Sequence, residues 1–143
     1  MNWKNGLVLL VGTLLTVCLC QQTLFAQACE GEEAMVDDYQ KGLIEMVEKV
    51  KSESLEDFRK AYHQKSCLSK LNLCASIVNV AIECLDKARQ DPATTKDQAK
   101  DIEARRESHN ALKTKVDQYK KELKAATSAE DAKALIAKFD LAK

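Results

Sequence analysis

The hydrophobic positions of this chain repeat at helical spacing, most extensively in residues 66–88. Apolar side chains follow one another there at alternating steps of four and three, which makes one stripe along a helix. The stripe consists of Cys67, Leu71, Cys74, Val78, Ala81, Leu85 and Ala88. A second apolar set flanks it at Leu73, Ile77, Val80 and Cys84. A helix apolar over so much of its circumference is expected in the middle of a small protein, with other helices around it.

The same spacing predicts helices on the N-terminal side of this stretch. One helix is expected from about residue 32 to 51. Ser54, followed by Asp57, has the pattern of a helix N-cap and predicts a second, short helix. That helix would turn apolar side chains inward at Leu55, Phe58 and Tyr62.

Two further helices are expected on the C-terminal side. Pro92 is the only proline and marks the clearest boundary, because proline cannot continue a helix but suits the first turn of the next one. Thr95 and Gln98 form a capping-box pattern for a long helix ending near residue 126. Ser128 caps a last short helix. With no alternating strand pattern, the chain predicts an all-α fold, a compact antiparallel bundle of about five helices.

Residues 1–28 have the pattern of a secretory signal peptide. Lys4 precedes the apolar run 7–19, and Ala26-Gln27-Ala28 is a small-x-small cleavage site. We therefore predict a secreted, extracellular protein with a single helical domain, 29–143. Cleavage after Ala28 would leave Cys29 first, as in an acylated lipoprotein, although Ala26 stands where a lipobox has leucine. The apolar run is too short for a stable membrane anchor.

The charge balance excludes some classes of partner. The chain has 22 basic and 22 acidic residues, and loss of Lys4 with the signal peptide leaves a net charge of −1. A protein that neutralises phosphates needs a basic excess, so no nucleic-acid partner is expected. No lysine-rich amphipathic face points to a membrane surface either.

Four cysteines follow the signal peptide, and the secretory route makes disulfides the default for all of them. They are Cys29, Cys67, Cys74 and Cys84. Three lie within 66–88, so each pairing scheme with two bridges includes one bridge inside that stretch. Bridged Cα atoms must lie within about 7 Å, whereas seven residues of helix span roughly 10 Å. Either the helix breaks, or some cysteines stay free or pair between chains.

The stretch 68–72 is the easiest place for such a break, because it holds Ser69 and Asn72. This favours a Cys67–Cys74 bridge across a turn, with Cys29–Cys84 fastening the N-terminus to the central helix. Bridges from Cys29 to Cys67 or Cys74 remain open alternatives. Two free thiols would instead indicate one bridge, from Cys29 to a cysteine of an unbroken helix.

Few side chains are spaced for chemistry. His63, Cys67 and Cys74 have a spacing that could hold zinc, although a histidine beside a disulfide is the simpler interpretation in an oxidising compartment. Arg105 and His109 interrupt the apolar stripe of the long helix that follows Pro92. They could orient the polar head of a ligand in a pocket, or lie where that stripe reaches solvent with the arginine stem over the core.

Acidic pairs on the same long helix have helical spacing, at Asp97 and Asp101 and at Glu103 and Glu107. Paired carboxylates serve acid–base catalysis only in a cleft beside a substrate, and on so charged a helix they are typical of a solvated face. Without a nucleophile motif or a phosphate-binding glycine loop, we predict that the protein is not an enzyme and uses no cofactor or metal.

The chain resembles the small secreted α-helical proteins of insects, including those in the saliva of blood feeders. The resemblance rests on the signal ending at Ala28, the acidic start 29–33, and the closely spaced cysteines of a helical remainder rich in lysine and glutamate. Residues 39–85 are also similar to the helical C-terminal region of mosquito collagen-binding antiplatelet salivary proteins. Those proteins carry a long Gly/Asp/Glu-rich repeat before that region, which this chain lacks. The resemblance implies a salivary role and assigns no functional residue.

Two functions lead, with an enzyme third and a structural self-associating protein fourth. The leading hypothesis is a secreted, non-enzymatic protein that binds another protein, such as a host factor met during blood feeding. It rests on the balanced charge, the cross-linked helical frame and the long charged helix faces. The alternative is a carrier that holds a small hydrophobic ligand between its helices, with Arg105 and His109 at the mouth of the pocket.

Overall fold

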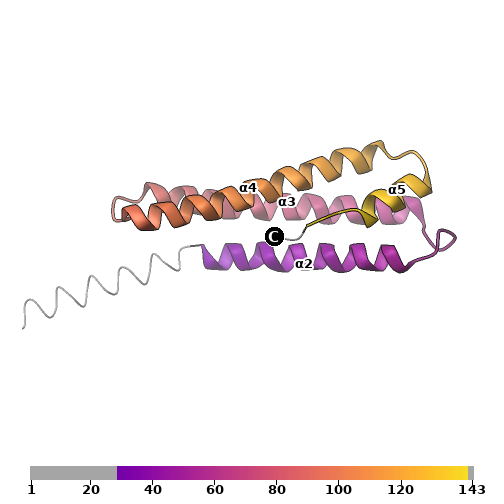
Figure 1. Ribbon diagram of the computed structural model, residues 1–143, viewed down its shortest axis with the longest axis horizontal. Coiled ribbons are helices and arrows are strands. Elements are labelled where there is room, and N and C mark those ends of the chain that lie inside the picture. The colour runs from indigo at the N-terminus through magenta and orange to yellow at the C-terminus, as the bar shows by residue number, and fades with distance from the viewer. Residues whose placement is uncertain (1–28, 142–143) are drawn as a thin grey trace, which may run out of the picture.

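The computed structural model describes residues 29–141 as four helices (Figure 1). They are α2 (Glu30–Ser52), α3 (Lys60–Gln90), α4 (Lys96–Ala125) and α5 (Ala129–Ala137). This part of the chain contains no strand, so the predicted all-α class is confirmed. The predicted signal peptide, 1–28, lies outside the described residues. The three long helices run side by side, and α5 contacts all of them near one end.

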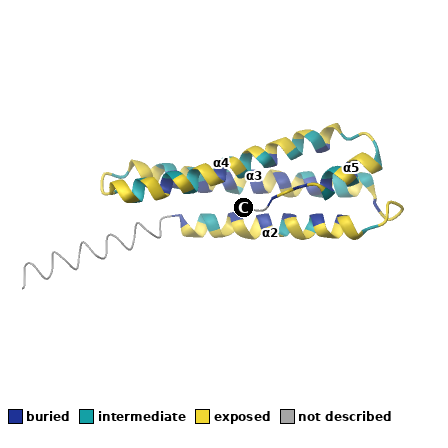
Figure 2. Ribbon diagram, in the orientation of Figure 1, coloured by how far each residue is buried: buried dark blue, intermediate teal, exposed yellow. Residues whose placement is uncertain are grey.

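The central helix is α3, which packs against both α2 and α4. All seven residues of its predicted inner stripe are buried, among them Val78 at 0% exposure. Their alternation with exposed positions appears as blue and yellow bands along the ribbon (Figure 2). Within 29–141, α3 alone is long and apolar enough to pass a test for a membrane span, and the core helix of a bundle passes the same test.

The second apolar set of α3 is less buried than expected. Leu73 is 46% exposed and Val80 is 49% exposed, while Ile77 and Cys84 are half-buried. The reason is geometric. The neighbours α2 and α4 both lie on the core side of α3, so the opposite side faces solvent.

The bundle has four helices in the described range, and the predicted short helix after Ser54 does not form. Residues 53–59 make a turn instead. The amide of Asp57 donates to Ser54 Oγ at 3.1 Å, as the cap pattern predicted, but no helix follows. Phe58 is buried as expected, whereas Leu55 is exposed and Tyr62 belongs to the exposed side of α3. Seven residues are enough for one capped turn only.

The predicted caps of α4 and α5 are confirmed. The amide of Gln98 donates to Thr95 Oγ1 at 3.3 Å, and the Gln98 side chain accepts from the amide of Thr95 at 2.8 Å. The Ser128 hydroxyl accepts from the amide of Asp131 at 3.0 Å. These bonds satisfy amides that have no partner inside the helix, and so determine where each helix begins.

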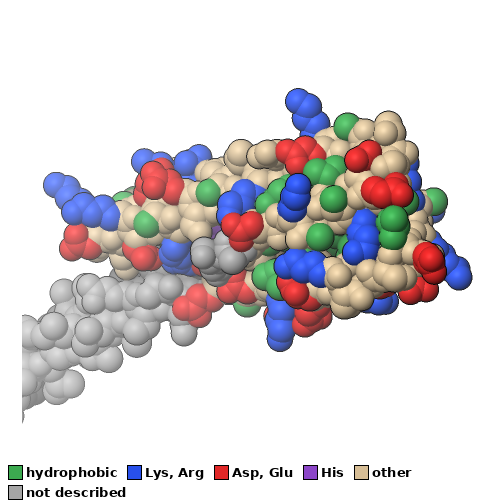
Figure 3. Space-filling model, turned by 45° about the vertical axis from the view of Figure 1, so that its right-hand side comes forward, with side chains coloured by type: hydrophobic (Ala, Val, Ile, Leu, Met, Phe, Trp, Pro, Cys, Tyr) green, Lys and Arg blue, Asp and Glu red, His purple; other side chains and the backbone are tan. Residues whose placement is uncertain are grey.

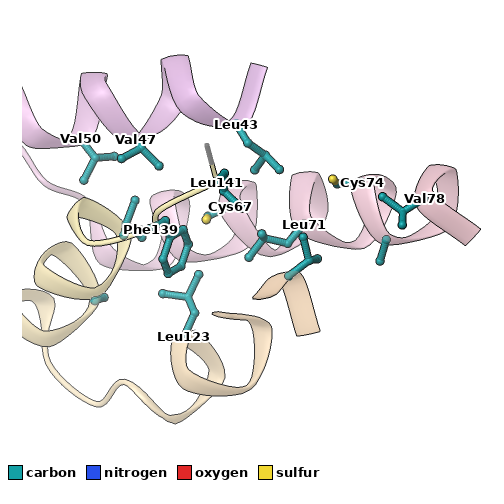
Figure 4. Packing of buried hydrophobic residues seen from close by; sticks show 14 of the residues in the cluster. Leu43, Val47, Val50, Cys67, Leu71, Cys74, Val78, Leu123, Phe139 and Leu141 are labelled. Atoms are coloured by element: carbon teal, nitrogen blue, oxygen red, sulfur yellow. The ribbon is translucent and has the colours of Figure 1, made fainter. Parts of the chain in front are cut away.

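At one end of the bundle, α5 and the residues after it fill the space between α2 and α4 (Figure 4). Phe139 and Leu141 are buried there, and the Phe139 ring stacks on Tyr119 with centroids 4.1 Å apart. Gln40 of α2 is also buried and its amide donates to the carbonyl of Leu141. The C-terminal segment therefore acts as the fourth wall of the core at this end.

Candidate functional site

A disulfide links the start of α2 to α3. Cys29 and Cys84 are bonded, with Cα atoms 5.8 Å apart and a sequence separation of 55. Cys29 precedes the first residue of α2 and is buried with Leu85, Ala88 and Ile102 in a small cluster of its own. The favoured pairing of these two cysteines agrees with this bond.

The other half of the predicted pairing is wrong. Cys67 and Cys74 are free and buried in α3, which continues unbroken through the expected turn. Ser69 and Asn72 do not interrupt it because their side chains lie on its exposed side. Burial raises the pKa of the Cys67 thiol to about 12, against a weaker opposing effect of Lys70, and also raises that of Cys74. Both thiols are therefore protonated core residues with little reactivity.

Arg105 and His109, the predicted ligand-pocket pair, meet a carboxylate of α2. Arg105 Nε donates to both oxygens of Glu33 at 3.1 Å, and a second guanidinium nitrogen also contacts it. His109 Nε2 lies 2.9 Å from Glu33 Oε1, and its side chain is only 7% exposed. Asp101, one turn before Arg105 on α4, adds a contact at 3.3 Å. This group of four side chains is called the Glu33 cluster below.

The electrostatics of the Glu33 cluster favour its charged form. Burial alone would raise the pKa of Glu33, but the hydrogen bonds and positive charges of Arg105 and His109 outweigh burial and lower it. The hydrogen bond to Glu33 raises the pKa of Arg105, against an opposing effect of burial. The cluster is thus an ion pair across the α2–α4 interface, joined by a histidine.

The sequence indicated only part of the Glu33 cluster as a possible site. Arg105 and His109 stood out as polar residues on an apolar stripe, and the structure gives both an internal partner. A ligand role for them stays a prediction. Glu33 was one of several acids at the start of a helix, where negative charge suits the helix dipole. Nothing local distinguishes Glu33 from Glu30 or Glu32, because only the rotation of α2 against α4 selects it.

The zinc ligands considered at His63, Cys67 and Cys74 are not brought together. Among the described residues, no three His, Cys, Asp or Glu side chains are placed to hold a metal. The His63 ring stacks on Phe58 with centroids 4.6 Å apart. Its Nε2 lies 3.0 Å from a carboxylate oxygen of Glu53 and its Nδ1 lies 3.0 Å from the carbonyl of Arg59. His63 thus holds the α2–α3 connection against the bundle.

Three of the four residues in the predicted acidic pairs of α4 take part in ion pairs. Asp101 contacts Arg105, as described above, and Asp97 lies 3.9 Å from Lys100. Glu103 contacts Arg89 of α3 at 2.6 Å. These contacts are those of a charged face, as the sequence suggested.

A groove of about 310 Å³ runs between α2 and α3. It was not anticipated from the sequence. The α2 wall consists of Gly42, Glu45, Met46, Lys49 and Val50, and the α3 wall of Tyr62, His63, Ser66 and Lys70. Tyr62 is 66% exposed, the most exposed large apolar side chain among the described residues. A Cβ added to Gly42 would meet nothing within 4 Å, so this glycine leaves the groove open.

A second hollow, of about 440 Å³, lies between α4 and α5 and is lined by three alanines and Leu135 together with Glu122, Asp131 and Lys138. On the face of the molecule in Figure 3, acidic and basic side chains are interspersed with hydrophobic ones.

Fold and site together define a small all-α bundle with a single observed disulfide in its described part. No protein-family model, no curated protein and no solved structure matches the chain.

Proposed function

We propose that this chain is a secreted, non-enzymatic protein that acts by binding another protein, and that the α2–α3 groove is its binding site. The observation that carries the proposal is the groove with an exposed tyrosine, Tyr62, at its rim. An exposed tyrosine offers a large apolar body and a polar tip, a combination enriched where proteins meet.

The lining of the groove suits a segment of a protein. Met46 and Val50 offer apolar contact, and methionine adapts its shape to different partners. Glu45, Lys49 and Lys70 surround them with charges of both signs. The groove therefore combines an apolar floor with a charged rim, as protein interfaces do.

The binding surface extends along α2 beyond the groove. Tyr39 and Met35 lie three and seven residues before Gly42 and so share its side of the helix. They are 39% and 45% exposed. The resemblance to insect salivary proteins suggests a host factor met during blood feeding as the partner.

The alternative function, a carrier of a small hydrophobic ligand, fits the groove less well. Its volume is at the lower end for ligand pockets, and its rim carries three charged side chains. Arg105 and His109, which were expected at the pocket mouth, contact Glu33 instead.

The test is a pull-down from serum with immobilised mature protein and two matched variants. Gly42→Leu fills the groove without a backbone clash, and Gly31→Leu makes the same change on α2 where an added Cβ also meets nothing. We expect a partner that is retained by the wild type and by Gly31→Leu and lost by Gly42→Leu. Tyr62→Ala should weaken the same partner.

Two outcomes would contradict the proposal. A partner captured equally by all variants binds elsewhere on the protein. No partner, together with a copurifying small molecule that fatty acids displace in native mass spectrometry, would establish the carrier instead.

A further inference from the structure

The solvent-facing side of α3 carries no charged residue in the middle of the helix. From Leu71 to Ile82 the chain has no Asp, Glu, Lys or Arg, although 31% of all its residues are charged. Leu73 and Val80 are about half exposed on this side. Depletion of charge around exposed apolar residues is the composition of an interface centre and not of an ordinary surface.

These exposed residues form a second stripe, which runs along α3 opposite the buried one. It also alternates by four and three residues, and we call it the outer stripe: Tyr62, Ser66, Ser69, Leu73, Ser76, Val80, Glu83 and Lys87. All of them are exposed except Ser66, which is intermediate. This spacing keeps one face of a helix against a neighbouring helix over several turns.

We propose that a second copy of this chain covers the outer stripe, so that two α3 helices pair antiparallel in a symmetric homodimer. Large and small side chains alternate along the middle of the stripe, from Ser69 to Val80. In the register that places Leu73 opposite Ser76 of the second copy, Val80 falls opposite Ser69. Leu73 and Val80 then each meet a serine, and two-fold symmetry repeats both contacts.

Ser76 can enter such a seam at low cost. The hydroxyl of Ser76 donates to the carbonyl of Asn72 at 3.1 Å within α3. Its proton is therefore already satisfied and needs no water, and the side chain offers its small volume to the facing leucine.

Charge complementarity selects the antiparallel direction. Lys65 and Glu83 are exposed beside the outer stripe and on it, near its opposite ends. In the same register, Lys65 of each chain lies beside Glu83 of the other chain, which gives two such pairs. Parallel pairing would place Lys65 beside Lys65 and Glu83 beside Glu83, and like charges at an interface disfavour that arrangement. Tyr62 falls opposite Lys87, where a cation–π contact can form.

The dimer seam and the α2–α3 groove share Tyr62 and Ser66 at one end of α3. Leu73 and Val80, at the centre of the seam, do not line the groove, so variants at these two residues test the dimer separately. The first test is sedimentation velocity of the mature protein across a concentration series. We expect a reversible monomer–dimer equilibrium. Leu73→Lys with Val80→Lys should raise the dimer dissociation constant more than about tenfold, because a buried lysine would lack a partner. Ile44→Lys, on α2 and 39% exposed, is the matched control and should leave it unchanged.

The second test reads the direction of pairing. Lys65→Glu alone should weaken the dimer about fivefold, and so should Glu83→Lys, because each creates two like-charged pairs. The double variant should restore the wild-type constant. Circular dichroism should show all variants equally folded.

A monomer at every concentration would overturn the proposal, as would a dimer that tolerates both lysines in the seam. Failure of the double variant to restore the dimer would exclude the antiparallel pairing.

Discussion

At the end of the bundle where α5 lies, α2 and α4 are joined through apolar side chains such as Ile136, Phe139 and Leu141. At the other end they are joined by the Glu33 cluster, and α2 is bonded to α3 through Cys29–Cys84. The two ends differ because only one of them has a further segment that packs between α2 and α4. One end has a fourth wall, so burial of apolar area holds it together. The other end has a cross-link and an ion pair.

This contrast implies different sensitivities. Apolar burial changes little with pH or redox conditions, whereas the Glu33 cluster requires an ionised carboxylate and the disulfide requires an oxidising compartment. The predictions below separate the two ends.

The largest effect is expected at Val78, in the middle of α3, on which both ends depend. Val78→Asp places an unpaired charge in the core and should lower the free energy of unfolding by about 3–5 kcal/mol. Ile44→Asp makes a comparable change at an exposed position and should cost little. Urea unfolding followed by circular dichroism measures both. If the two variants unfold at similar urea concentrations, α3 is not the central helix.

The cross-linked end should depend strongly on its disulfide. Replacing Cys29 and Cys84 together by serine should cost about 2–4 kcal/mol, mainly because the unfolded chain loses a constraint. Cys74→Ala changes a buried free thiol and should cost less, since it only removes a small core group. Differential scanning calorimetry of both variants tests whether loss of the disulfide lowers the melting temperature more than loss of the Cys74 thiol.

Thiol titration in denaturant checks the cysteine states behind this prediction. Mature protein should show two thiols before reduction and four after it, because Cys67 and Cys74 are free. Under native conditions the two thiols should react slowly. A denatured protein without thiols would contradict the unbroken α3.

The ionic end should be sensitive to acid. Glu33→Gln removes the charge that Arg105 and His109 contact and should cost about 1–2 kcal/mol at neutral pH. Because the pKa of Glu33 is lower in the folded protein than its ordinary value of 4.5, the folded chain binds fewer protons in that range. The stabilisation is complete above that value and is lost as the pH falls through the folded pKa.

Urea unfolding across acidic pH is the measurement. The gap between wild type and Glu33→Gln should close as the pH falls below 4.5. A gap that stays constant would mean that the amide costs stability through shape and not through charge.

The smallest predicted effect is a gain in stability. Gly42→Ala should stabilise the protein by about 0.5–1 kcal/mol, because alanine favours the helix interior and its Cβ meets nothing here. Gly31→Ala, in the first turn of α2, should gain less. A loss at Gly42 would mean that the groove closes around this position in solution.

Much of the fold could be predicted from the sequence because its signals are local. The caps at Thr95 and Ser128 involve residues three apart, and Pro92 excludes a continuing helix. The inner stripe of α3 is a periodic pattern that any buried helix must have. The error at Ser54 has the same origin, since its cap forms but the seven residues between α2 and α3 hold only one turn.

Long-range pairings were decided by tertiary structure. Cys29 bonds to Cys84, and Glu33 meets Arg105 and His109, across 55 to 76 residues. Such pairings depend on how far one helix slides and turns against another. If a helix were rotated by the angle of one residue, a different acid or cysteine would face the neighbouring helix. The second apolar set of α3 was also expected inside the bundle, and only the positions of α2 and α4 left Leu73 and Val80 of this set exposed. Local hydrogen bonds and periodicity therefore specify each helix, whereas the sites arise from the rotation of whole helices about one another.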